Sequence, residues 1–199
     1  MSIIVTKFGG SSLCDAARFQ NVASILNADP ARRYVVPSAP GKRYDGDEKV
    51  TDLLYQCHRL SSGGKDFAKP FSQVEERYRE IAEALSLSDA YREELQAIRE
   101  KLPKETTPDY AASRGEYLCG IMLAEYLGWE FLDAADVICF DADGKLDSEC
   151  TQTLCKAALK HRERAVIPGF YGSMPDGRIK TFSRGGSDVT GAIVARAAM

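Results

Sequence analysis

Two pairs of adjacent glycines, each beside a basic residue and a serine, are the segments of this sequence best suited to bind an anion. They are Lys7-Phe8-Gly9-Gly10-Ser11-Ser12 and, within the stretch from Thr181 to Thr190, Ser183-Arg184-Gly185-Gly186-Ser187-Asp188. Glycine lets the backbone approach an oxygen-rich ligand closely, and a lysine or arginine adds a full positive charge. Since each pair opens a helix, free N–H groups add to the attraction. Together the two segments predict a site that binds two anionic groups.

Each segment also has a purely structural interpretation. The first can be a tight turn in which Ser12 and Asp15 form a capping box while Lys7 lies in solvent. In the second, Asp188 can orient a lysine or hold Mg²⁺, but it can equally complement the helix dipole while Arg184 makes a surface ion pair. The first segment matches neither the Rossmann fingerprint nor the Walker pattern, so neither of those sites is predicted there.

Two further segments offer polar side chains. Ser113-Arg114-Gly115-Glu116 has the S-x-x-E spacing, for which a capping box is the favoured interpretation. The loop around Ser38 can present a hydroxyl to a ligand or be a plain turn. No serine, histidine and acid set stands out, and no cluster has the spacing of metal ligands, so no protein metal centre is expected.

The six cysteines do not form a recognisable framework. They lie at positions 14, 57, 119, 139, 150 and 155, with no C-x-x-C pair. This spacing fits neither a zinc site nor a disulfide scaffold in so long a chain. The sequence therefore predicts reduced, mostly buried thiols in a cytoplasmic protein.

Strands alternate with helices along the chain. Strands are expected at 3–5, 34–36, 130–132, 137–139, 165–167 and 179–182, and helices at 16–26, 50–57, 113–127, 148–161 and from 188 to the end. The charged, amphipathic stretch at about 65–102 predicts a helical hairpin that breaks near Leu87-Ser88. This order indicates an α/β fold, a single domain over 1–199 with a mainly parallel sheet, in which ligands bind at the carboxyl ends of strands.

Composition excludes several classes of protein. Of 199 residues, 44% are apolar and 28% charged, with a net charge of −3, which is typical of a soluble globular domain. Proteins that bind nucleic acid or anionic lipid carry a basic excess, so neither partner is expected. No run of 18 apolar residues is present to span a membrane.

The glycine-rich segments, in their order, resemble the aspartate kinases of the amino-acid kinase superfamily. The first segment looks like that family's opening signature, and Val35-Val36-Pro37-Ser38-Ala39-Pro40-Gly41-Lys42 followed by Val50-Thr51-Asp52-Leu53-Leu54 resembles its second-strand loop and the next helix. Ser113-Arg114-Gly115-Glu116 matches its S-x-G-E segment, and Phe170-Tyr171-Gly172 with 183–188 matches its late block. The resemblance covers nearly the whole chain and implies a three-layer αβα sandwich.

The resemblance also implies a reaction and residue roles. The reaction is transfer of the γ-phosphate of ATP, with Mg²⁺, to the side-chain carboxylate of L-aspartate, on the route to lysine, threonine and methionine. By resemblance, the phosphate is bound by Lys7, Gly9, Gly10 and Ser11. Asp188 orients the lysine or binds a metal ion. By resemblance, the substrate is bound by Ser38, Thr51, Glu116, Arg184 and Ser187. The role of Glu116 competes with capping, and Pro37 departs from the small or aliphatic residue usual before the serine.

Relative to the family, the sequence stops early. The segment rich in Asp, Thr and Pro that builds the adenine and ribose side of the nucleotide site does not follow Met199, nor do regulatory ACT domains. The sheet is therefore expected to be incomplete at its nucleotide-binding side and the chain to form a homo-oligomer that covers the exposed sheet. Two hypotheses follow: the N-terminal part of an aspartate kinase, or a non-catalytic aspartate-binding or assembly module.

Overall fold

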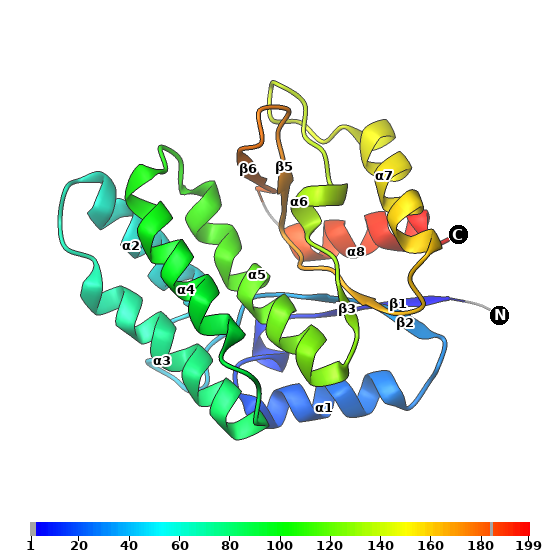
Figure 1. Ribbon diagram of the computed structural model, residues 1–199, viewed down its shortest axis with the longest axis horizontal. Helices are drawn as coiled ribbons and strands as arrows, with labels where there is room; N and C mark the ends of the chain where they lie inside the picture. The colour runs from blue at the N-terminus through cyan, green and yellow to red at the C-terminus, as the bar shows by residue number, and fades with distance from the viewer. Residues whose placement is uncertain (1–2, 184) are drawn as a thin grey trace.

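A four-stranded parallel sheet is the centre of the computed structural model, which describes residues 3–183 and 185–199. The strands lie in the order β1-β2-β4-β3 (Figure 1). Their bounds are β1 Ile4–Phe8, β2 Arg32–Pro37, β3 Glu130–Phe131 and β4 Ala165–Val166. Because all four run in the same direction, the loops that follow them emerge at one edge of the sheet.

The residues of β2 show why helices cover both faces of the sheet. Tyr34, Val35 and Val36 are each at most 2% exposed. Alternate residues of a strand point to opposite faces. Val35 accordingly belongs to one apolar core, and Tyr34 and Val36 belong to the other. An apolar run buried on both sides is typical of a parallel strand in an α/β fold.

Helices α1 and α8 lie on opposite sides of this sheet in Figure 1. The core that contains Val35 also contains residues of α1 (Ala16–Asn27) and α5 (Pro108–Leu127). The core on the other face contains residues of α7 (Ser148–Lys160) and α8 (Gly186–Ala197). The expected three-layer arrangement with a mainly parallel sheet is confirmed.

Three helices extend the first core away from the sheet, at the left of Figure 1. They are α2 (Val50–Ser62), α3 (Ala68–Leu85) and α4 (Ala90–Lys101), and a short 3-10 turn at Leu102–Lys104 leads from them to α5. Helix α3 ends at Leu85, and its C-cap, Ser86, adopts the left-handed conformation with φ of 56°. The chain therefore breaks close to the predicted position, between two amphipathic helices.

Two segments differ from the sequence expectation. The strand predicted at 137–139 is wrong, because Val137 ends the short helix α6 (Ala134–Val137) and Cys139 makes only an isolated bridge to Ser173. A hairpin of β5 (Tyr171–Ser173) and β6 (Ile179–Thr181) stands apart from the main sheet. The apolar run at 137–139 is buried against this hairpin and α7 rather than against the main sheet, and its composition alone cannot distinguish these environments.

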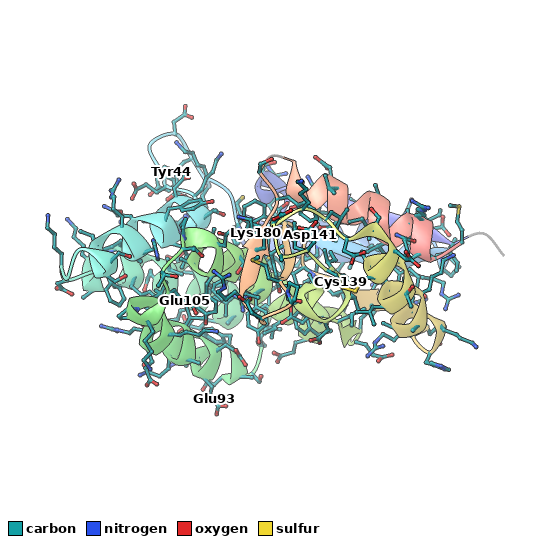
Figure 2. The ribbon with its side chains drawn as sticks, turned by 90° about the horizontal axis from the view of Figure 1, so that it is seen from above. Tyr44, Glu93, Glu105, Cys139, Asp141 and Lys180 are labelled. Carbon is teal, nitrogen blue, oxygen red and sulfur yellow. A yellow bond between two sulfur atoms is a disulfide. The ribbon has the colours of Figure 1, made fainter. Side chains whose placement is uncertain are left out.

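The prediction for the cysteines is wrong for one pair. Cys139 and Cys150 form a disulfide between the segment after α6 and the first turn of α7, whereas Cys14, Cys57, Cys119 and Cys155 are free and buried. Cys139 lies in the half of the molecule that carries α7 (Figure 2). The two cysteines are 11 positions apart in the sequence, and only the fold brings them together.

Among the described residues, no helix combines the length and the apolar character needed to cross a bilayer.

Candidate functional site

The site lies where β1 and β2 end and α8 begins. Phe8 and Pro37 are paired at the ends of the two strands, so the glycine pair after β1 and Ser38 after β2 emerge side by side. Helix α8 packs on both strands, and Gly191 lies against the side chain of Lys7, since a Cβ at Gly191 would be 3.6 Å from Lys7 Cβ. The fold therefore joins the two glycine-rich segments, which are more than 170 residues apart in the sequence.

Lys7 and Asp188 form an ion pair across this junction. Lys7 Nζ lies 3.1 Å from Asp188 Oδ1, with the side chains 30% and 72% exposed. Asp188 is in the first turn of α8. The structural interpretation, in which Lys7 lies free in solvent, is therefore wrong. The pair leaves an ammonium group partly exposed, oriented by a carboxylate, at the carboxyl end of the sheet.

The two adjacent glycines serve different purposes. A Cβ at Gly10 would lie 2.7 Å from the carbonyl oxygen of Ala39 and 3.0 Å from the nitrogen of Gly41, whereas one at Gly9 would meet only Lys7 Nζ, at 3.7 Å. Gly10 is therefore required by the close approach of two loops. Gly9 borders the lysine and leaves space beside its ammonium group.

We expect Gly10→Ala to lower the free energy of unfolding by about 1–3 kcal/mol, because the added methyl group forces two backbone segments apart. Gly9→Ala is the matched control, with an expected change below about 1 kcal/mol. Urea unfolding followed by circular dichroism measures both. Equal losses from the two substitutions would contradict this distinction between the glycines.

The capping box predicted for Ser12 and Asp15 is wrong, because Asp15 is itself the N-cap of α1 and Ser12 ends a short 3-10 turn, Gly10–Ser12. Asp15 caps α1, and its Oδ1 accepts a hydrogen bond from the backbone N–H of Arg18 at 2.8 Å. Among the described residues, the backbone N–H groups of Gly10 and Ser11 donate to no partner. The glycine pair therefore opens a short 3-10 turn rather than α1, and it keeps amides available next to Lys7.

Ser38 and Ser187 meet although they come from different loops. Ser38 Oγ donates a hydrogen bond to Ser187 Oγ at 2.9 Å. Pro37, the departure from the family pattern, does not displace Ser38, whose backbone N–H donates to Phe8 O at 3.0 Å. A Cβ at Gly169 would lie 2.6 Å from Ser187 Oγ, so only glycine lets the chain after β4 pass this close.

A strained turn beside Ser187 completes this part of the site. Phe170 adopts φ of 83°, a left-handed conformation that is unfavourable for a residue with a side chain. Its backbone N–H donates to Thr190 Oγ1 of α8 at 3.1 Å, and its carbonyl accepts from Phe182 N–H at 2.9 Å. Sequence reasoning did not single out Thr190, because its hydroxyl acts on a residue 20 positions away.

Glu116 is buried within α5 and does not cap a helix. The helix begins at Pro108, so Ser113 lies inside it and donates to Tyr110 O at 2.7 Å. The capping interpretation of S-x-x-E is therefore wrong. Gly115 allows α5 to approach the loop after β2, since a Cβ there would lie 2.7 Å from Ala39 Cβ. That approach puts Glu116 beside the backbone of Ala39.

The carboxyl group of Glu116 has a strongly perturbed environment. Burial raises its pKa to about 8, although a backbone hydrogen bond from Ala39 and the charge of Arg114 oppose the rise. Its Oε2 atom is buried without a hydrogen-bond partner in the described part of the chain. A buried carboxyl with an unsatisfied oxygen can accept a hydrogen bond from a cationic ligand, which would favour its ionised form.

Arg114 is a described residue whose positive charge acts on Glu116, and it is itself enclosed by aromatic rings. Its guanidinium carbon lies 4.8, 4.4 and 5.1 Å from the ring centres of Tyr110, Tyr117 and Tyr171. Such cation–π contacts stabilise an arginine that is only 6% exposed. Within the described residues these rings, rather than a carboxylate, surround the guanidinium next to Glu116.

Two further residues were expected from the sequence to bind the substrate, Thr51 and Arg184, and the structure describes only the first. Thr51 is the second residue of α2 and is partly exposed. Backbone N–H of Val50 donates to Pro40 O at 3.3 Å, which ties the start of this helix to the loop of Ser38. Arg184 lies outside the described residues.

Asp109 was missed by sequence reasoning although it positions the late glycine segment. Its Oδ1 accepts from Thr181 N–H at 2.8 Å and from Thr181 Oγ1 at 2.6 Å, and Lys180 Nζ lies 3.3 Å away. Lys180 lies near the middle of the molecule in Figure 2. These contacts fix the end of β6, from which the chain leads to Ser187. No signal in the sequence points to this role, because an aspartate in the first turn of a helix is expected there only for its contact with the helix dipole.

Within residues 3–183 and 185–199, no group of three or more His, Cys, Asp or Glu side chains could hold a metal ion alone. Mg²⁺ commonly binds through one or two carboxylates together with the phosphates of a substrate. Asp188, with its largely exposed carboxylate, fits that kind of shared coordination.

Comparison with known proteins agrees with this geometry. The family model described as the amino acid kinase family matches residues 2–199. The chain belongs to the amino acid kinase family. Its sheet, with the glycine loop and the start of α8 meeting at the ends of β1 and β2, is thus this family's fold.

Related proteins within the family are aspartate kinases. The crystal structure of Clostridium acetobutylicum aspartate kinase is 46% identical with a TM-score of 0.96, over 99% of this chain and 46% of that one. Aspartokinase 3 of Bacillus subtilis is 35% identical over 96% of this chain and 45% of its own length. Escherichia coli aspartokinase III, solved in complex with aspartate and ADP, is 27% identical with a TM-score of 0.82 over 99% of this chain and 47% of that chain. The chain thus spans about half the length of these relatives.

Proposed function

We propose that this chain carries the aspartate-binding and phosphate-binding parts of an aspartate kinase. The reaction transfers the γ-phosphate of ATP to the side-chain carboxylate of L-aspartate and gives 4-phospho-L-aspartate, on the route to lysine, threonine and methionine. The observation that carries the proposal is the ion pair of Lys7 with Asp188, which lies at the strand ends where Ser38 and Ser187 meet. The similarity to aspartate kinases supports it.

The polar groups of the site suit this reaction. A carboxylate nucleophile is already ionised at neutral pH and needs no general base, so a site without histidine is sufficient. Phosphoryl transfer then depends on positioning and on neutralising charge. In this proposal Lys7 neutralises the transferred phosphoryl group, while the loop of Gly9, Gly10 and Ser11 surrounds it. Asp188 orients Lys7 and is the residue that would hold Mg²⁺, which would supply further charge neutralisation when bound.

The substrate amino acid is held by groups of opposite charge. Glu116 accepts hydrogen bonds from the ammonium group of aspartate, and this contact ionises the buried carboxyl. Arg184 forms a bidentate pair with the α-carboxylate, as its residue type and place in the late glycine segment suggest. Three hydroxyls, from Ser38, Thr51 and Ser187, complete the pocket. We also propose a homo-oligomer, because β1 and β3 are open edges of the sheet within the described residues.

The direct test is formation of an acyl phosphate. Chain, ATP, Mg²⁺ and L-aspartate are incubated with hydroxylamine, which converts 4-phosphoaspartate to a hydroxamate that iron(III) makes visible. We expect colour that depends on both substrates. Binding of aspartate by calorimetry without hydroxamate at any enzyme concentration would instead support the non-catalytic binding module.

A second measurement tests the pocket itself. We expect Arg184→Ala to weaken aspartate binding at least roughly tenfold, because a bidentate charged contact is lost. Arg196→Ala, which removes an exposed arginine from the last turn of α8, is the control. Unchanged affinity in Arg184→Ala would exclude this carboxylate contact.

A further inference from the structure

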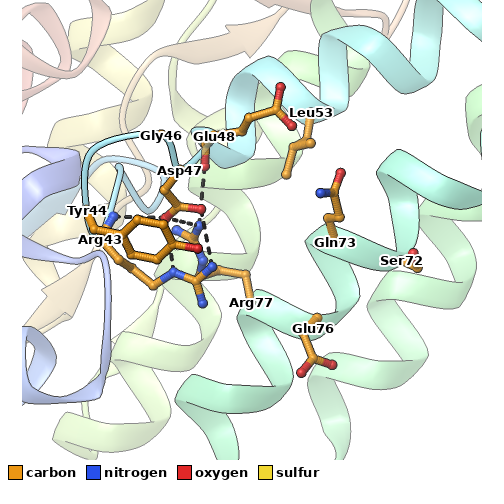
Figure 3. Close-up of a pocket in the computed structure, with 10 residues that line it drawn as sticks. All are labelled: Arg43, Tyr44, Gly46, Asp47, Glu48, Leu53, Ser72, Gln73, Glu76 and Arg77. Atoms are coloured by element: carbon orange, nitrogen blue, oxygen red, sulfur yellow. Dashed lines mark hydrogen bonds and ion pairs between the residues drawn. The ribbon is translucent and has the colours of Figure 1, made fainter.

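A buried arginine on α3 reaches the loop that covers the glycine pair. Arg77 is 2% exposed, and its Nη1 donates to Gly41 O at 2.7 Å. Its Nη2 donates to Asp47 Oδ2 at 2.6 Å and to Glu48 O at 3.3 Å. Figure 3 shows the guanidinium of Arg77 directed toward Asp47. One side chain therefore holds both ends of the segment 41–48.

The first of these contacts leads directly to the proposed phosphate loop. Gly41 N–H donates to Gly10 O at 2.9 Å, and a Cβ at Gly41 would lie 2.7 Å from the carbonyl carbon of Gly10. The carbonyl that Arg77 binds therefore belongs to the residue that packs on Gly10. Two hydrogen bonds in series connect α3 with the loop next to Lys7.

The outer side of the loop borders a pocket that is open to solvent. An open pocket of about 610 Å³ borders the segment, and Tyr44, Glu48 and Glu76 are among the residues that line it. Tyr44 is 64% exposed and extends from the loop, as Figures 2 and 3 show. On this side the hydrogen bonds from the side chains of Arg43 and Arg77 tie the loop to α3 and to itself.

Two arginines hold the carboxylate of Asp47 in its ionised form. Arg43 also binds Asp47, through Nε at 3.0 Å and through its backbone N–H at 2.9 Å. Burial by itself would raise the pKa of Asp47, but the hydrogen bonds from Arg43 and the charge of Arg77 outweigh burial and hold this pKa well below its usual range. The cluster is therefore present throughout the neutral pH range.

We propose that Arg77 is a positioning residue for the proposed phosphate site, which it holds in shape by fixing Gly41 against Gly10. This inference rests on the proposed function only for the identity of the ligand. Arg77 touches neither substrate in this proposal and acts through the backbone of the loop. A lysine at position 77 would keep the charge next to Asp47, but its single ammonium group could not also hold Gly41 and Glu48 in the same geometry.

The test compares Arg77→Lys with Arg79→Lys. Arg79 lies on the same helix, is exposed, and pairs with Glu76 and Glu83, so its replacement matches the chemical change without touching the loop. Amide hydrogen exchange of the full chain is followed by NMR. We expect exchange at Gly41 and Leu13, whose N–H groups donate to Gly10 O, to become at least roughly tenfold faster in Arg77→Lys only. Exchange at Leu118, in the core of α5, is expected to stay unchanged.

A binding measurement gives the second readout. We expect tripolyphosphate, titrated by calorimetry, to bind at least roughly fivefold more weakly to Arg77→Lys than to the unmodified chain or Arg79→Lys. Unchanged exchange at Gly41, or equal acceleration at Gly41 and Leu118, would overturn the positioning role. If the unmodified chain binds neither tripolyphosphate nor aspartate, the proposed function fails, and the exchange at Gly41 still decides the role of Arg77.

Discussion

Replacing Glu116 by glutamine is expected to remove a large pH dependence from the stability of this protein. The pKa of Glu116 is raised to about 8 in the folded protein by burial, against about 4.3 in an unfolded chain. The folded protein therefore keeps a proton that the unfolded chain has lost between these two values. The stabilising contribution of the protonated carboxyl is complete below the unfolded pKa and is lost as pH rises toward 8.

The size of the effect follows from the width of this window. Each pH unit inside it changes the free energy of unfolding by about 1.4 kcal/mol, so the unmodified protein should lose roughly 3 kcal/mol relative to Glu116→Gln between pH 5.5 and 7.5. Urea unfolding at both pH values measures this difference. Other titrating groups cancel because they are common to both proteins.

Glu93→Gln is the matched control, since Glu93 is exposed on α4 and lies at the edge of the molecule in Figure 2. The free energy of unfolding of the Glu93→Gln variant should change with pH in parallel with that of the unmodified protein. If the free energy of unfolding of Glu116→Gln also changed with pH in parallel with that of the unmodified protein, Glu116 would be ionised when the site is empty. The proposed gain of charge on binding an ammonium group would then be wrong.

Replacing Lys7 by methionine is expected to remove phosphoryl transfer while leaving the fold intact. Lys7 forms an ion pair with Asp188 beside the glycine loop. In the proposed reaction it neutralises charge on the transferred phosphoryl group. Loss of such a preorganised charge costs about 10²–10³ in turnover. The ion pair itself is partly exposed, so its loss should change the free energy of unfolding by less than about 1 kcal/mol.

The hydroxamate assay measures turnover, and urea unfolding measures stability. Lys65→Met, which removes an exposed lysine from the segment before α3, is the control for the change in net charge. If the chain alone does not turn over, calorimetric binding of tripolyphosphate takes the place of the assay, and Lys7→Met should abolish it. Retained turnover or binding in Lys7→Met would exclude Lys7 from the site.

The local sequence was sufficient to predict the order of most helices and strands. Alternation and helical spacing are properties of neighbouring residues, so α1, α2, α7 and β2 appear close to the predicted positions. The strand predicted at Val137–Cys139 failed because a short apolar run can be buried by a helix as well as by a sheet. The S-x-x-E pattern misled for a similar reason, since the helix begins at Pro108, five residues before Ser113.

The sequence by itself determined the residue types of the site: two glycine pairs, a lysine, an aspartate and the serines, in an order that resembles the aspartate kinases. Only the tertiary structure decided which of them meet. It pairs Lys7 with Asp188, distinguishes Gly10 from Gly9, and buries Glu116 against the loop after β2. It also shows that Arg77 reaches the glycine loop through Gly41. The physical reason is that contact distance, burial and pKa depend on segments far apart in the chain, whereas residue type and periodicity are local.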